Sequence, residues 1–170
     1  MNKPIFILNT KIGIIFDINQ NLHKFAYSKN NVCMQKIVIL DFGGQYAHLI
    51  ANRVRRLGVF TEIHSPAAPV SELEGAAGII YSGGPSSVYD ENAPEYNPEI
   101  INIPVPKLGI CYGHQLMAYM AGGEIAPAAC GSEYGKAVVR VEKSPLFRDL
   151  PTESVVWMSH TDFVKRLPDG

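Results

Sequence analysis

The feature that most constrains this chain is an apolar run that leads directly into a cysteine set between two glycines. The run covers positions 105–110, and Cys111 follows in the arrangement Gly109-x-Cys-x-Gly113. An amphipathic helical pattern begins directly afterwards, at 116–120. A strand, a tight turn and a helix in this order form a nucleophile elbow, in which glycines let the strand and the helix approach closely. The sequence therefore predicts an elbow that pushes the cysteine side chain out above the edge of a sheet.

At such an apex Cys111 would stand at the N-terminus of a helix. The helix dipole and the unpaired backbone N–H groups there favour the thiolate, which is the nucleophilic form of cysteine. A buried, inert cysteine beside two turn glycines is the alternative. We favour the reactive cysteine because a second glycine-rich turn, at 82–85, lies upstream after another apolar run.

Composition excludes several other classes of function. The chain has 170 residues, enough for one domain with a core, and a formal net charge of −1 without a basic stripe, so we expect no nucleic-acid partner. No apolar run reaches the roughly 18 residues that cross a bilayer, so we expect no membrane association. The three cysteines, Cys33, Cys111 and Cys130, lack metal-type spacing. They suit a reducing, cytoplasmic compartment and indicate no metal site.

Residues 1–33 differ from the rest in being rich in Asn, Ile and Lys. They make a poor secretory signal, since polar residues interrupt the apolar stretch and no small-residue cleavage site follows. We predict that 1–33 is an extension, or a mis-called start, outside a functional domain at 34–170. A genuine N-terminal hairpin remains the alternative.

The remainder alternates between strand and helix patterns, which predicts an α/β fold with a mainly parallel open sheet flanked by helices. Two later strand-like segments suggest a mixed or antiparallel addition at one edge. The predicted strands are 36–41, 59–64, 78–81, 105–110, 137–141 and 154–158, and the first helix is 46–57, ended by Gly58.

Ligands in such folds bind at the carboxyl ends of the strands, where Asp41, the 82–85 turn and Cys111 would converge. A thiolate that attacks a carbonyl needs hydrogen-bond donors for the developing oxyanion. The backbone N–H of Tyr112 is one candidate donor, and that of Gly84 is the other. A plain strand-ending turn is the alternative for 82–85.

The attack also needs a base, normally a histidine oriented by a carboxylate. Of the five histidines, His114 shares the helix of Cys111 and would point back poorly at the sulfur. His160 and Asp162 come nearest to a pair, but we interpret them as a substrate-lining loop.

The segments Gly109–Gln115 and Ser82–Pro85 together resemble the class I glutamine amidotransferases, a family with a flavodoxin-like fold. The stretches Ile39–Tyr46 and Trp157–Asp162 resemble, within that family, the glutaminases that feed ammonia to an ATP-dependent synthetase converting XMP to GMP. The resemblance covers Met34–Gly170.

The resemblance implies that Cys111 attacks the side-chain amide of glutamine, and that Gly84 and Tyr112 supply the oxyanion hole. It implies no cofactor in this domain, and it implies a synthetase domain or subunit, which uses ATP and Mg²⁺, as the partner. The implied glutamine-binding residues are Gly83, Gln115, Ser159, His160, Thr161 and Asp162.

The family takes its catalytic His and Glu from a His-Pro-Glu motif, which does not occur before Gly170. We therefore expect a C-terminally incomplete domain and an inactive or weakly active fragment. Thr161 stands where a smaller residue is common, which would narrow the glutamine pocket slightly. Two alternatives remain: an amidotransferase of anthranilate or carbamoyl-phosphate synthesis, and a non-catalytic, partner-binding module of the same fold.

Overall fold

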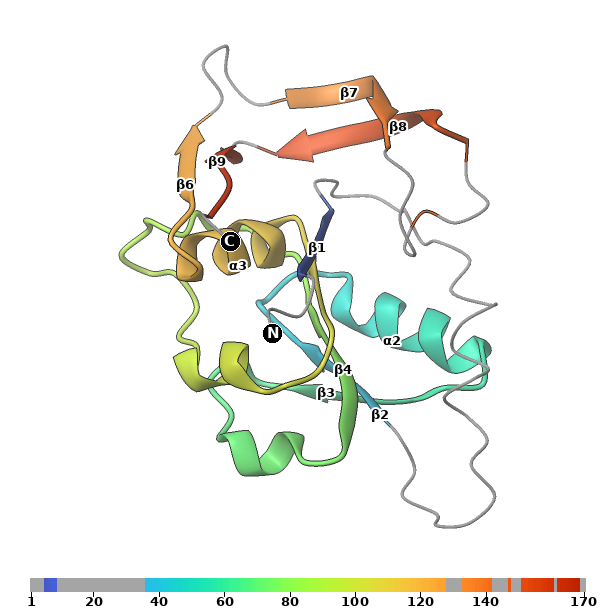
Figure 1. Ribbon diagram of the computed structural model, residues 1–170, viewed down its shortest axis with the longest axis vertical. Coiled ribbons are helices and arrows are strands. Elements are labelled where there is room, and N and C mark those ends of the chain that lie inside the picture. The colour runs from blue at the N-terminus through green and yellow to red at the C-terminus, as the bar shows by residue number, and fades with distance from the viewer. Residues whose placement is uncertain are drawn as a thin grey trace.

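The computed structural model describes residues 5–8, 36–127, 133–141, 147, 151–160 and 162–168. Its centre is a five-stranded sheet in the order β1-β5-β4-β2-β3, and every neighbouring pair is parallel (Figure 1). This confirms the predicted α/β class with a mainly parallel sheet. The strands are β1 (Ile5–Leu8), β2 (Lys36–Leu40), β3 (Phe60–His64), β4 (Ala76–Tyr81) and β5 (Lys107–Ile110).

The central strands β2 and β4 are apolar on both faces because both faces are covered. Val38 and Ile79 face one layer, while Ile39 and Ile80 face the other, and all four are at most 7% exposed. Continuous apolar runs of this kind are typical of parallel strands between helices.

Helix α2 (Ala47–Arg56) covers one face of the sheet. Its buried residues, Ala47, Ala51 and Val54, pack against Ile39 and Ile80. The helix ends before Gly58, which adopts φ 78°, as the sequence predicts.

The opposite face is covered by helix α3 (Tyr112–Met120) and by two 3-10 helices, η1 (Val70–Leu73) and η2 (Pro98–Asn102). Leu116 and Met117 of α3 are fully buried in this core. The side chain of Asn97 caps η2 by accepting the N–H of Glu99 at 3.0 Å.

The segments after α3 differ from the prediction of an addition to one sheet edge. They form two separate antiparallel ribbons, β6 (Glu124–Pro127) with β9 (Asp162–Arg166), and β7 (Glu133–Arg140) with β8 (Glu153–His160). Figure 1 shows the β7–β8 ribbon at the top, beyond the end of the main sheet. Strand-like patterns identify strands but not their partners, since each strand can pair with any free edge.

The main sheet also contains part of the predicted N-terminal extension. Ile5–Leu8 pairs in parallel with β5, and Leu8 lies opposite Ile110. A short apolar run can complete an otherwise unpaired strand edge in this way. The structure thus places these four residues in the sheet, while the domain boundary at 33/34 stays a prediction.

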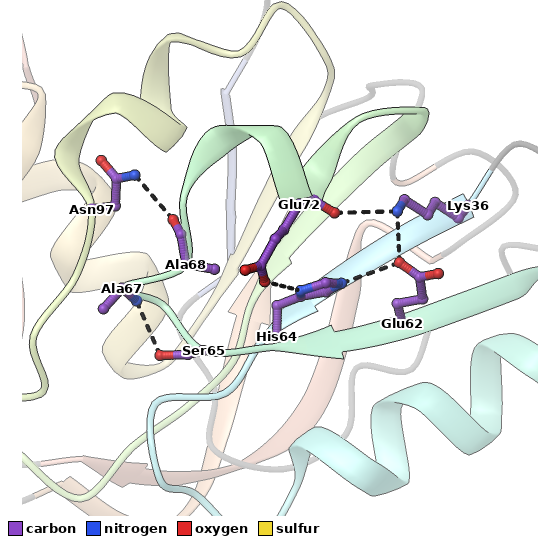
Figure 2. A network of polar contacts seen from close by, with 8 residues as sticks. All are labelled: Lys36, Glu62, His64, Ser65, Ala67, Ala68, Glu72 and Asn97. Atoms are coloured by element: carbon purple, nitrogen blue, oxygen red, sulfur yellow. Dashed lines mark hydrogen bonds and ion pairs between the residues drawn. The ribbon is translucent and has the colours of Figure 1, made fainter.

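A polar network ties η1 to the edge of the sheet that lies farthest from β5 (Figure 2). The Lys36 ammonium donates to Glu62 Oε2 at 2.6 Å and to the carbonyl of Glu72 at 3.3 Å. The His64 ring lies between two carboxylates, with Nε2 3.1 Å from Glu62 and Nδ1 3.4 Å from Glu72.

This network makes the free energy of unfolding depend on pH. The hydrogen bond from Lys36, helped by the one with His64, holds the pKa of Glu62 below its ordinary value of 4.5. A carboxyl with a lowered folded-state pKa stabilises the fold above its unfolded pKa, and this contribution is lost as the pH falls below about 4.5.

We therefore expect Lys36→Met to lower stability by about 0.5–1 kcal/mol at neutral pH, a small value because Glu62 is 34% exposed and water screens the pair. The loss should shrink once Glu62 is protonated. Urea unfolding at about pH 7 and about pH 3.5 measures both. Lys165→Met, which removes the more exposed pair with Glu124, is the matched control and should have a smaller effect. An equal loss at both pH values would show that packing, not charge, is responsible.

Candidate active site

The predicted elbow is present at the junction of β5 and α3. β5 ends at Ile110, and Cys111 is the N-cap of α3. Cys111 has φ 49° and ψ −112°, and it is the one non-glycine residue with positive φ in the part of the chain that the structure describes. Backbone conformations of this kind are strained for residues with a side chain, and they concentrate at functional sites.

The flanking glycines are required by close backbone approach. A Cβ on Gly109 would lie 2.6 Å from the Cα of His114. A Cβ on Gly113 would lie 2.6 Å from the carbonyl carbon of Tyr81 and closer still to its oxygen. Any side chain at either position would force β4, β5 and α3 apart.

Cys111 differs from the prediction in one respect, because it is only 4% exposed. The cover comes partly from the turn after β4. A Cβ built on Gly83 would lie 3.5 Å from the Cβ of Cys111, so the backbone of Gly83 runs directly beside the cysteine. The cysteine at the elbow is therefore buried, with the neighbouring turn packed against it.

The turn after β4 is hydrogen-bonded to the helix side of the elbow. The N–H of Gly113 donates to the carbonyl of Ser82 at 3.0 Å, which joins the first turn of α3 to this segment. The structure therefore places Gly83 and Tyr112 next to Cys111, while the contacts that it shows for Gly84 are with Phe42. Their roles in an oxyanion hole stay a prediction.

A third loop, the one after β2, is hydrogen-bonded to the turn after β4. The N–H of Phe42 donates to Ser82 Oγ at 3.2 Å, and the N–H of Gly43 donates to Asp41 Oδ1 at 3.0 Å. The N–H of Asp41 is bonded in turn to the carbonyl of His64. The loops after β2, β4 and β5 thus meet at the same end of the sheet, as expected from parallel strands.

The structure shows a contact for one of the predicted glutamine-binding residues, Gln115, and only the position in the chain for several others. The amide Nε2 of Gln115, which is 3% exposed, donates to the carbonyl of Asp162 at 2.7 Å and so joins α3 to the start of β9. Ser159 and His160 are the last residues of β8 rather than part of a loop, and Thr161 lies outside the described residues. Their contact with glutamine stays a prediction.

Sequence reasoning missed an aromatic cluster next to the cysteine. The ring of Phe42 stacks on Tyr81, with centroids 5.9 Å apart, and packs at a tilt against Tyr112 at 5.3 Å. Burial raises the pKa of the Tyr81 phenol, and burial together with Tyr96 and Asp90 raises the pKa of Tyr112 to about 12. Both phenols are therefore neutral at physiological pH. The signal that could have identified this cluster was an aromatic residue one or two positions before a glycine at each of three strand ends.

The histidine–carboxylate contacts that the structure describes belong to His64, at the end of β3. β3 lies three positions from β5 in the sheet order, about 14 Å away at the usual spacing between strands. His64 therefore lies too far from Cys111 to act as its base. His48 is exposed on α2, and His114 is buried on α3.

The described segments contain neither a candidate metal site nor a helix that could cross a membrane. Within them, no group of three or more His, Cys, Asp or Glu side chains could hold a metal ion. Within the same segments, no helix has the length and apolar character needed to cross a membrane.

A parallel α/β sheet with a strained cysteine at a strand–helix elbow, flanked by a glycine-rich turn, defines the class as an α/β protein with an elbow of the nucleophile-elbow type. The model of the family "Glutamine amidotransferase class-I" matches residues 38–170, and the chain belongs to this family.

Particular relatives narrow the comparison. The chain is 52% identical over 137 residues to a GMP synthase (glutamine-hydrolysing) of Caldicellulosiruptor saccharolyticus, and 50% identical over 139 residues to that of Bacillus subtilis. These matches cover 79% and 80% of the chain but only 27% of either relative. The chain therefore spans about a quarter of the length of these curated relatives.

Two solved structures are also similar to this chain. The crystal structure of a proposed GMP synthase subunit from Thermoplasma acidophilum matches with a TM-score of 0.67 and 33% identity, over 80% of this chain and 69% of that one. A glutamine amidotransferase of Thermotoga maritima matches with a TM-score of 0.63 at 22% identity, over 79% of this chain and 64% of that one, which supports the fold alone.

Proposed function

We propose that this chain hydrolyses glutamine through a thioester on Cys111 and supplies the ammonia for GMP synthesis. The observation that carries the proposal is the strained elbow at Cys111, placed directly beside Gly83 of the glycine-rich turn. A nucleophile next to backbone N–H donors is the arrangement that acyl transfer requires.

In the proposed reaction the sulfur of Cys111 attacks the side-chain amide carbon of glutamine. The carbonyl π electrons move to oxygen, and the backbone N–H groups of Gly84 and Tyr112 stabilise the oxyanion. When the intermediate collapses, the C–N bond breaks and the nitrogen leaves as ammonia, carrying the proton that the thiol gave up. Water then hydrolyses the γ-glutamyl thioester, which releases glutamate and restores the thiol.

The remaining binding roles follow the same proposal. Gly83, Gln115 and the segment 159–162 hold the glutamine, with Gln115 fixed by its bond to Asp162. The ammonia passes to an ATP- and Mg²⁺-dependent synthetase partner that aminates XMP to GMP, in the cytoplasm. Support for this partner comes from the GMP synthase relatives, which are about four times as long as the matched region.

We expect turnover of glutamine to be slow compared with the first acylation of Cys111. In the part of the chain that the structure describes, the histidine in contact with carboxylates is His64. It stands at the far side of the sheet, too far from Cys111 to act as its base. Removing the base of a triad reduces the rate by several orders of magnitude.

The first half of the reaction is tested with a chloroketone analogue of glutamine and mass spectrometry of the intact protein and its peptides. We expect one adduct, on Cys111, with protection by L-glutamine. Asparagine, which is one methylene shorter, is the matched competitor and should not protect. Cys111→Ala should abolish the adduct. Equal labelling of Cys33 or Cys130, or labelling that glutamine does not slow, would contradict the proposal.

A further inference from the structure

The hydroxyl of Ser82 is a buried polar group to which the reaction assigns no direct role. Ser82 follows β4, and its side chain is fully buried. Its Oγ accepts the N–H of Phe42 at 3.2 Å and donates to the carbonyl of Gly83 at 3.1 Å. The hydroxyl therefore joins the loop after β2 to the turn beside Cys111.

The bond to Gly83 fixes the direction of a peptide group. The described peptide bonds are all trans, so the C=O of Gly83 and the N–H of Gly84, which share one peptide plane, point in opposite directions. The C=O points to the Ser82 hydroxyl and to the loop after β2. The N–H of Gly84 therefore points away from that loop.

Gly44, in the loop after β2, restrains the same peptide at its carbonyl group. A Cβ on Gly44 would lie closer than 3.0 Å to the carbonyl oxygen of Gly83 and 3.0 Å from its carbon. A Cβ on Gly84 would lie 2.6 Å from the carbonyl oxygen of Phe42. The two loops thus meet backbone to backbone, and only glycine fits at either position.

We propose that Ser82 and Gly44 set the plane of the Gly83–Gly84 peptide and thereby aim the N–H of Gly84 at the oxyanion that forms at Cys111. A peptide between two glycines rotates easily, so a donor placed there needs an external restraint. Ser82 is a positioning residue, since its hydroxyl contacts the peptide and not the substrate. The inference rests on the proposed glutaminase function for its consequence, but not for the peptide geometry itself.

The geometry is tested by NMR without any reaction. Residual dipolar couplings report the direction of the Gly84 N–H bond in the wild type, Ser82→Ala and Ser86→Ala. We expect the Ser82→Ala coupling to change or average, while Ser86→Ala, which removes a hydroxyl from the same loop, leaves it as in the wild type. Ser82→Thr keeps the hydroxyl and should restore the wild-type coupling. An unchanged Gly84 coupling in folded Ser82→Ala would overturn the proposal.

Two measurements decide the matter if Ser82→Ala does not fold. Gly44→Ala pushes on the same carbonyl group and should change the same coupling. The wild type itself should show a nuclear Overhauser cross-peak between the Gly84 amide proton and the β protons of Cys111. Absence of that cross-peak in the folded wild type would also overturn the proposal.

The chemical consequence is tested by comparing two reactions of Cys111. Acylation by a γ-glutamyl thioester passes through an oxyanion, whereas alkylation by iodoacetamide does not. Loss of one oxyanion-hole donor reduces rates by about 100–1,000-fold, so a misdirected donor in Ser82→Ala should slow acylation by about 10–100-fold. Alkylation should change by less than about twofold, since the thiol itself is untouched.

The outcomes separate this inference from the proposed function. If the wild type is not acylated, the glutaminase proposal fails and the dipolar couplings still decide whether Ser82 orients the peptide. If the wild type is acylated and folded Ser82→Ala is acylated equally fast, the positioning role is wrong while the glutaminase proposal stands. An equal fall in both reactions would indicate general damage and would also count against positioning.

Discussion

Gly113→Ala is expected to prevent the chain from folding. In an ordinary helix this change is stabilising by about 1 kcal/mol, since alanine is the better helix former. Here the added Cβ would lie 2.6 Å from both the carbonyl carbon and the Cβ of Tyr81. The carbonyl cannot move without breaking the β4–β5 pairing. We expect a loss above about 4 kcal/mol, a large part of the stability of a small domain.

The measurement is urea unfolding followed by circular dichroism, with Gly78→Ala as the matched control. A Cβ on Gly78 would meet the terminal carbon of the Ile37 side chain at 3.1 Å, and that group can rotate away. We expect the control to fold with a loss of about 1 kcal/mol or less. A folded Gly113→Ala protein with near-normal stability would show that α3 does not rest on β4 in this way.

Cys111→Gly is expected to abolish the chemistry and to give a more stable protein than Cys111→Ala. The angles of Cys111, φ 49° and ψ −112°, are those of the first central residue of a type II′ turn, where glycine dominates. Alanine keeps this strain and glycine relieves it. Strain of this kind is about 1–3 kcal/mol, and glycine's greater unfolded-state freedom offsets up to about 1 kcal/mol of it.

The two variants are compared by thermal and urea unfolding, and both by the glutamine chloroketone. We expect Cys111→Gly to exceed Cys111→Ala by about 1 kcal/mol, with no adduct at position 111 in either. Equal stabilities would mean that the elbow is not strained at its apex. The expected result would show that Cys111, the proposed nucleophile, is also a residue whose backbone strain lowers the stability of the fold.

The elements that the sequence predicted well are those specified by local pattern. The apolar runs at β2 and β4, the helix ended by Gly58, and the elbow around Cys111 each depend on neighbours within about ten residues. The glycine pattern around Cys111 also predicted that Gly113 is needed for close packing. That prediction did not require knowing that the packed residue is Tyr81.

The features that escaped prediction depend on partners distant in the sequence. The Gln115 amide meets the Asp162 carbonyl 47 residues away, and no local pattern specifies that bond. The edge strand at Ile5–Leu8, the pairing of β6 with β9 and the burial of Cys111 under Gly83 have the same origin. Each is decided by which surfaces remain uncovered once the local elements have formed.

The pairing of Ile5–Leu8 with β5 has a consequence for the order of folding events. The two strands are separated by about a hundred positions, whereas β2, β3 and β4 pair over much shorter spans. Closing so long a loop is slow and entropically unfavourable, and it becomes favourable once the rest of the sheet presents a finished edge. We therefore expect this strand to be added late. Until then the backbone groups on the open side of β5 are exposed, and aggregation competes with folding most strongly at that stage.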